Sequence, residues 1–266
     1  MDTNLLILCV LTFVIHLIGT LAYAARIAGV RTGHLATALT LFNLLILVSR
    51  TSNSFQAPFL AKRIETSSFD NGAALLVDFQ WILGSAALAT LVRAVLVPSA
   101  HRAMSRAVML LQRHRSLFRL CFHAMHPRRL LLARRFLAVP SIRSMGTLRH
   151  RGGLSWSFLG LNAIAVALWS VGVFASLFAG SLEPGLRVTC SNLSSIINGV
   201  ATILMFLLLD PQLSLLTDDV AHHRTGEGTF RAAVASLVGA RFVGVLLAQL
   251  LLVPAAHLIA IVARAL

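Results

Sequence analysis

Ionisable side chains inside long apolar runs are the residues of this chain that could do chemistry. Arg241 lies in the last apolar run, Asp78 in the third and Arg50 near the end of the second. A charged side chain at the centre of a bilayer costs roughly 2.5 kcal/mol or more unless it is paired or faces water. Each of the three is therefore a candidate for a polar pathway. The alternative is an ion pair between Asp78 and either Arg50 or Arg241.

Arg50 opens a polar segment that continues with Asn53 and Gln56, and Asn43 lies on its helix face. We expect Pro58 to end this helix because proline removes a backbone donor and clashes with the preceding turn. A helix that begins at about His34 would then place Arg50 about 24 Å along its axis, near the outer boundary. Arg50 would either snorkel to the interface or, with Asn53 and Gln56, contact a substrate.

Two other helices carry polar faces. His16 shares one face of the first apolar run with Thr20 and Tyr23. Asn198 belongs to a similar face of the fifth run, together with Ser191, Ser195 and Thr202. Such a face indicates either a hydrogen-bonded seam between helices or the lining of a hydrated cavity. His16 and Asn198 are candidate substrate contacts under the second reading.

The elements that must position these residues are membrane-spanning helices. The chain is 57% hydrophobic and only 12% charged, with a mean hydropathy of +0.82. These values predict an all-α, polytopic membrane helix bundle in one transmembrane domain over residues 1–266. We expect about six spans: Asn4 to Ala24, His34 to Val48 with an extension toward Gln56, Asn71 to Val97, Leu154 to Ala179, Thr189 to Leu209, and Ala232 to Val262.

Residues 101–151 form a basic segment between the third and fourth spans. It holds 12 of the 23 Lys and Arg residues and no acidic one. Basic loops stay in the cytoplasm, so this segment is predicted to be cytoplasmic and both termini to lie on the outer face. Apolar residues among the arginines favour amphipathic inner-leaflet helices, broken at Pro127 and Pro140, that bind anionic phospholipids. A solvated topology anchor is the alternative, and the few aromatic residues disfavour nucleic-acid binding.

No catalytic residues and no metal or cofactor site are expected. The acidic and histidine residues from Asp210 to Glu227, including Asp218 and His222, lie between the last two spans. Nothing in their spacing completes a metal site, so an exposed cytoplasmic loop is the prediction.

A family resemblance covers residues 21–58. Its parts are the Gly29-Val30-Arg31-Thr32 turn, the run Ser49-Arg50-Thr51-Ser52-Asn53, and Gln56. This stretch resembles the opening of the Amj family, alternate lipid II flippases that can stand in for MurJ in bacterial cell-wall synthesis. The six-span layout also fits that family.

The resemblance implies a non-enzymatic carrier in the bacterial cytoplasmic membrane that moves lipid II from the inner to the outer leaflet for peptidoglycan synthesis. Lipid II is a polyprenyl pyrophosphate with a bulky, anionic head group. Arg241 would hold the pyrophosphate from the inner side, and Arg50, Asn53 and Gln56 would meet it near the exit. Six helices are few for such a cargo, so a homodimer or a groove open to lipid fits the expectation. The alternatives are transport of another polyprenyl phosphate lipid, an isoprenoid-phosphate enzyme, and a membrane scaffold.

Overall fold

The computed structural model describes residues 2–66, 72–117, 119 and 152–266. Within them, six helical stretches are long and apolar enough to cross a membrane, which confirms the all-α class and the number of spans. The helices are α1 (Thr3–Thr32), α2 (Leu35–Thr66), α3 (Gly72–His114), α7 (Trp156–Leu182), η3 (Pro184–Leu186), α8 (Arg187–Leu204), the π-helix η4 (Met205–Leu209), α9 (Asp210–Ala221) and α10 (Glu227–Ala265).

The first two helices form a tight hairpin with conventional ends. Asp2 caps α1 by accepting a hydrogen bond from the Leu5 backbone N–H at 2.8 Å. Gly33 ends α1 with a φ of 72°, a left-handed conformation that glycine adopts without steric cost. Inside the hairpin, a side chain on Gly29 would lie 2.6 Å from the Cβ of Ala38, so only glycine lets the two helices approach this closely.

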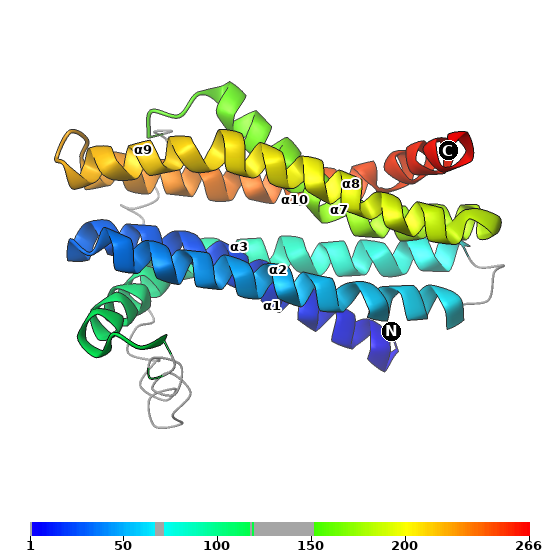
Figure 1. Ribbon diagram of the computed structural model, residues 1–266, viewed down its shortest axis with the longest axis horizontal. Coiled ribbons are helices and arrows are strands. Elements are labelled where there is room, and N and C mark those ends of the chain that lie inside the picture. The colour runs from blue at the N-terminus through cyan, green and yellow to red at the C-terminus, as the bar shows by residue number, and fades with distance from the viewer. Residues whose placement is uncertain (1, 67–71, 118, 120–151) are drawn as a thin grey trace.

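The helices form two layers, one of α1, α2 and α3 and the other of α7, α8, α9 and α10 (Figure 1). The layers meet most extensively where α3 packs against α10. Phe79 of α3 is fully buried there and packs edge-to-face on Phe174 of α7, with ring centroids 5.4 Å apart. Both termini lie at the same end of the bundle, as an even number of spans requires (Figure 1).

The prediction that Pro58 ends the second helix is wrong. α2 continues through Pro58 to Thr66. Arg50 therefore lies about 15 residues, or about 23 Å, from the start of α2 and about as far from its end. A proline is tolerated inside such a helix because neighbouring helices and side chains compensate for the lost backbone bond. Arg50 is therefore a mid-helix residue, and its place relative to the outer boundary of the membrane stays a prediction.

The start of the basic segment also differs from the prediction. Residues 101–114 continue α3, and Val108 and Leu111 pack against the α1–α2 hairpin. His101 pairs with Arg31 at 2.7 Å, which ties this extension to α1. Most of the remaining segment, with Pro127, Pro140 and the surface helices expected there, lies outside the described residues.

The predicted loop after the fifth span is helical over half its length. Residues 184–221 form one continuous helical stretch in which η4 leads into α9, and the turn to α10 begins only at about His222. Asp210 is the first residue of α9 and is half-buried. The expectation of an exposed loop from Asp210 onward is therefore wrong for residues 210–221.

A glycine pair on α10 gives a direct test of the packing between α10 and α7. A Cβ on Gly244 would lie 2.5 Å from the Ala163 carbonyl oxygen, whereas a Cβ on Gly239 would meet nothing within 4 Å. We expect Gly244→Ala to lower the free energy of unfolding by about 2 kcal/mol, because backbone atoms must shift. Gly239→Ala should raise it by about 0.5 kcal/mol through helix propensity. Thermal unfolding of the purified protein in detergent measures both, and equal midpoints would contradict the close crossing.

Candidate functional site

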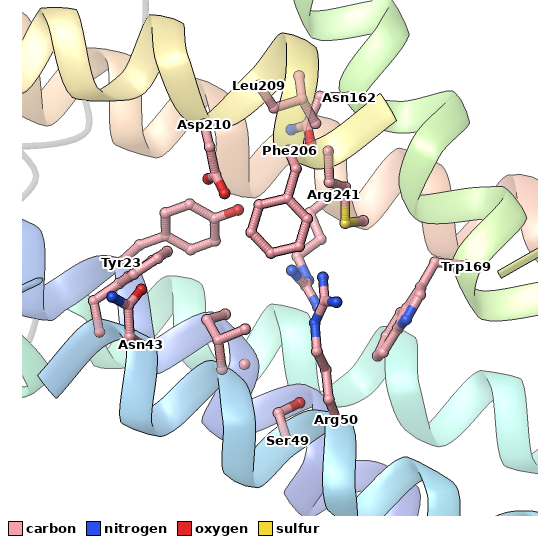
Figure 2. Close-up of a pocket in the computed structure, with 14 residues that line it drawn as sticks. Tyr23, Asn43, Ser49, Arg50, Asn162, Trp169, Phe206, Leu209, Asp210 and Arg241 are labelled. Carbon is pink, nitrogen blue, oxygen red and sulfur yellow. The ribbon is translucent and has the colours of Figure 1, made fainter. Parts of the chain in front are cut away.

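A pocket lies between the two layers, on the side away from the contact between α3 and α10 (Figure 2). Its volume is about 690 Å³, counting the part open to the outside. Every spanning segment except α3 contributes to it. The lining residues are Gly19 and Tyr23 of α1, Phe42, Asn43, Ile46, Ser49 and Arg50 of α2, Asn162 and Trp169 of α7, Met205, Phe206 and Leu209 of η4, Asp210 of α9, and Arg241 of α10.

Arg241 is the most buried cation of the pocket. Its guanidinium carbon lies 5.9 Å from the ring centre of Trp169, the residue midway along the 27-residue α7. Tyr23 is its hydrogen-bond partner. Its exposed fraction is 7%, yet no carboxylate in the described part of the chain lies within ion-pair distance, and its Nε has no hydrogen-bond partner. A buried cation in this state strongly favours the arrival of an anion.

Arg50 enters the pocket from the opposite layer. Its guanidinium carbon lies 4.9 Å from the ring centre of Phe206, and it too forms no ion pair with a described residue. Figure 2 shows the Arg50 and Arg241 side chains directed into the same space between Phe206 and Trp169. Cation–π contact stabilises a guanidinium without neutralising its charge, so both groups keep their capacity for an anionic ligand.

Close packing between α1 and α2 leaves space beside Gly19 for the side chain of Arg241, next to the segment of α2 that carries Arg50. Ser49 donates a hydrogen bond to the Ile15 carbonyl oxygen at 3.0 Å, across the seam between the helices. A Cβ on Gly19 would lie 2.9 Å from the Ser49 hydroxyl and 3.5 Å from a terminal nitrogen of Arg241. The absence of a side chain at Gly19 therefore leaves room for both the seam and the Arg241 head group.

Asp210 lines one end of the pocket, and Arg26 lies behind it. The Asp210 carboxylate lines the pocket and lies 3.6 Å from Arg26 of α1, which also donates to the Ser214 hydroxyl at 3.2 Å. The Arg26 guanidinium stacks 4.2 Å from the ring centre of Phe42, another lining residue. This end therefore carries both a cation and a carboxylate, whereas Arg50 and Arg241 have no such carboxylate partner.

The π-helix η4 supplies three lining residues and sets the position of a fourth. A π turn contains about one residue more than an α turn, so the helix that follows is rotated by about 100° relative to a regular helix. Asp210 follows η4 directly and faces the pocket together with Phe206. Such turns occur frequently at functional sites.

Two of the predicted site residues, Arg50 and Arg241, line the pocket, and a third lies next to it. His16 is buried, and its ring centre lies 5.6 Å from that of Trp169. The spacing that aligned Asn43 with Arg50 is confirmed, since both line the pocket. The other four predicted residues do not line it, and their contact with a substrate stays a prediction.

Three of these four belong to α2 or α8. Gln56 is buried and donates a hydrogen bond to the Thr12 hydroxyl in the α1–α2 seam. Asn198 packs against α7 so closely that a Cβ on Gly172 would lie 2.7 Å from its side-chain oxygen. Asn53 is half-buried on α2. Gln56 and Asn198 thus occupy helix seams, which for Asn198 is the alternative that the sequence left open.

Asp78 pairs with neither of its expected partners. Arg63 of α2 donates to it at 2.6 Å and also contacts Asp2 at 2.9 Å. The cluster joins α1, α2 and α3 at the end of the bundle where the chain begins. The N–H of Leu5 and then Arg63 hold the pKa of the Asp2 carboxyl below its usual range. The sequence missed this pairing because Arg63 was placed beyond a helix end at Pro58.

The Asp78 contact predicts a stability effect. We expect Asp78→Asn to lower the free energy of unfolding by about 1 to 3 kcal/mol, because Arg63 is mostly buried and loses a charged partner. The double variant Asp78→Asn with Arg63→Gln should recover part of this loss, since the mostly buried guanidinium is then absent and only the exposed Asp2 carboxylate loses a partner. Thermal unfolding of the single and double variants measures the coupling. An Asp78→Asn protein as stable as the wild type would contradict it.

The sequence did not single out several lining residues. Trp169, Met205 and Phe206 have no charge and no unusual spacing, so nothing distinguishes them from ordinary packing residues. Asp210 carried a signal, an acidic residue directly at the end of an apolar run, but was assigned to a loop.

The fold and the pocket together define a class, the polytopic membrane proteins with an arginine-lined pocket between two layers of helices. The family model for Amj, described as "Alternate to MurJ", matches residues 11–263. The protein named lipid II flippase Amj from Bacillus subtilis (strain 168) is 33% identical over 262 residues, which cover 97% of this chain and 96% of that protein. No solved structure matches the chain. The chain belongs to the Amj family, and it is a multi-pass membrane protein.

Proposed function

We propose that this chain is a lipid II flippase and that its pocket binds the pyrophosphate of the cargo. The observation that carries the proposal is the pair of arginines, Arg50 and Arg241, that share one pocket without a carboxylate partner among the described residues. The relative from Bacillus subtilis is named a lipid II flippase. The pocket offers the chemistry that this cargo requires.

The arginines suit a pyrophosphate in particular. A guanidinium presents several N–H donors in a planar fork that matches phosphate oxygens, and such charge-assisted bonds are about twice as strong as neutral ones. Trp169 and Phe206 flank the two cations and limit their hydration. A pyrophosphate between Arg50 and Arg241 would exchange water for donors inside the helix bundle, where an unpaired anion is costly.

The rest of the cargo has to remain partly outside the pocket. The pocket is small and partly open to the outside, so it would hold the pyrophosphate while the disaccharide-pentapeptide stays at its opening. Asn43 of α2 and Phe206 of η4 are both exposed and both line the pocket, so it is open between these segments. The polyprenyl tail would stay in lipid at this opening while the head group crosses.

The orientation and the partners belong to the same proposal. The chain would lie in the bacterial cytoplasmic membrane with both termini outside and with anionic phospholipids against its basic inner end. Movement of the helices from α1 to α10 would expose the pocket alternately to the two sides of the membrane. A homodimer would supply further wall for the head group. Transport of another polyprenyl phosphate lipid uses the same arginine chemistry and is distinguished by the cargo assay below.

Complementation in bacteria tests the proposal. The chain is expressed in cells depleted of their lipid II flippases, and lipid II in the outer leaflet is measured together with growth. We expect both to be restored by the wild type at normal membrane abundance. An inserted wild-type chain that restores neither would overturn the proposal. Arg241→Gln, at matched abundance, serves as the site-specific control.

A further inference from the structure

Arg26 is a buried arginine that forms only a long ion pair and leaves one of its donors without a hydrogen bond. Its side chain is only 4% exposed, its contact with Asp210 is a long one at 3.6 Å, and its Nε has no hydrogen-bond partner. By comparison, the ion pair between Arg63 and Asp78 is 2.6 Å long. Arg26 therefore keeps hydrogen-bonding capacity that Asp210 does not use.

The position of Arg26 is directly behind the pocket wall. It contacts two lining residues, Phe42 through its ring face and Asp210 through the carboxylate. The Asp210 side chain is 33% exposed, so it stands between the buried guanidinium and the open part of the pocket. Arg50 acts on Asp210 electrostatically as well. An anion that entered the pocket would compete with Asp210 for the two arginines.

We propose that Arg26 is a third phosphate-binding arginine, masked by Asp210 until the pyrophosphate of the cargo takes the place of the carboxylate. This inference rests on the proposed function, since it assigns a further residue to the same pocket. The exchange involves no covalent step. A pyrophosphate presents more acceptor oxygens and more negative charge than one carboxylate, so it can use the donor capacity of Arg26 that is now unused.

The exchange would also loosen one connection between the two layers. Arg26 belongs to α1, whereas Asp210 and Ser214 belong to α9, so their contacts join the layers. The ion pairs Arg63–Asp78 and Arg264–Glu183 each stay within one layer. Cargo that displaces Asp210 therefore weakens an interlayer contact, and by reciprocity the loss of that contact favours cargo binding.

Binding of farnesyl pyrophosphate, a short-chain probe, to the purified full-length chain in detergent tests the inference. Asp210→Asn should bind about tenfold more tightly than the wild type, because the competing charge is removed. Arg26→Lys keeps the charge opposite Asp210 but loses the planar fork, so it should bind about tenfold more weakly. The exposed pair provides the control, and Asp219→Asn, beside Arg224, should bind as the wild type does.

The outcomes separate the two proposals. If the wild type does not bind the probe, or if Arg241→Gln binds equally well, the proposed function of the pocket fails. If Arg241→Gln loses binding while Arg26→Lys keeps wild-type affinity, Arg26 is only a structural partner of Asp210 and the inference is overturned. Thermal unfolding of Arg26→Lys in detergent gives a second arm, because a loss of binding that only follows a fall in the thermal midpoint would mark Arg26 as structural and overturn the inference.

Discussion

Replacing Arg241 with glutamine is expected to reduce lipid II translocation by about 100-fold. Arg241 is a buried cation that lies over the ring of Trp169, the residue midway along α7. It has no carboxylate partner in the described part of the chain. Its charge-assisted bonds to the pyrophosphate would each contribute about 1.5 to 3 kcal/mol, and glutamine supplies neither the charge nor the fork. Translocation of labelled lipid II by proteoliposomes measures the effect.

The stability of the Arg241→Gln protein separates a cargo contact from a packing role. A buried charge without a carboxylate partner is costly, so its removal should leave the thermal midpoint unchanged or raise it. Arg224→Gln is the matched control, because Arg224 is 65% exposed and lies in the turn before α10. A fall in the thermal midpoint that parallels the loss of transport would contradict the assignment of Arg241 to the cargo.

Replacing Arg50 with lysine should reduce translocation by about tenfold, and replacing it with glutamine by about 100-fold. Arg50 lies near the middle of α2 and faces Phe206 across the opening of the pocket. Lysine keeps a positive charge but loses the fork that binds two phosphate oxygens at once, whereas glutamine loses both. The same proteoliposome assay, at matched protein content, measures the series.

The order of the series at Arg50 is the informative result. The half-buried side chain forms no ion pair with a described residue, so both variants should fold with thermal midpoints close to that of the wild type. Equal transport by the arginine, lysine and glutamine proteins would show that Arg50 only snorkels toward the interface.

The sequence predicts the spans and the two central arginines for a clear physical reason. Apolar length determines which segments cross a bilayer, and an arginine that interrupts such a segment needs an anion, water or a carboxylate. Arg241 and Arg50 were found on that argument, and helical periodicity correctly placed Asn43 beside Arg50. These inferences depend on local sequence alone, which is why they could be made.

The remaining site depends on tertiary features that local patterns do not encode. Proline rules predicted an end at Pro58, but packing carries α2 on to Thr66, which moved Arg50 to mid-helix and hid the pairing of Arg63 with Asp78. The π turn of η4 breaks the 3.6-residue spacing just before Asp210, so periodicity could not place that carboxylate in the pocket.

The two layers are held together differently on their two sides. Their main contact lies along α3 and α10, where large apolar side chains such as Phe79 and Leu252 are fully buried. The pocket lies on the other side, where the connections include the polar contacts of Arg26 with Asp210 and Ser214. Apolar packing on one side and exchangeable polar contacts on the other suit a movement in which the pocket side opens while the α3–α10 contact is kept.

Translocation of lipid II by the purified wild-type chain, reconstituted alone into liposomes, tests the central claim most directly. Labelled lipid II is placed in one leaflet, and its appearance in the other is measured against liposomes that contain Arg241→Gln at equal abundance. We expect transfer with the wild type and about 100-fold less with Arg241→Gln. Equal transfer by the two proteins, or none by a folded wild type, would contradict it.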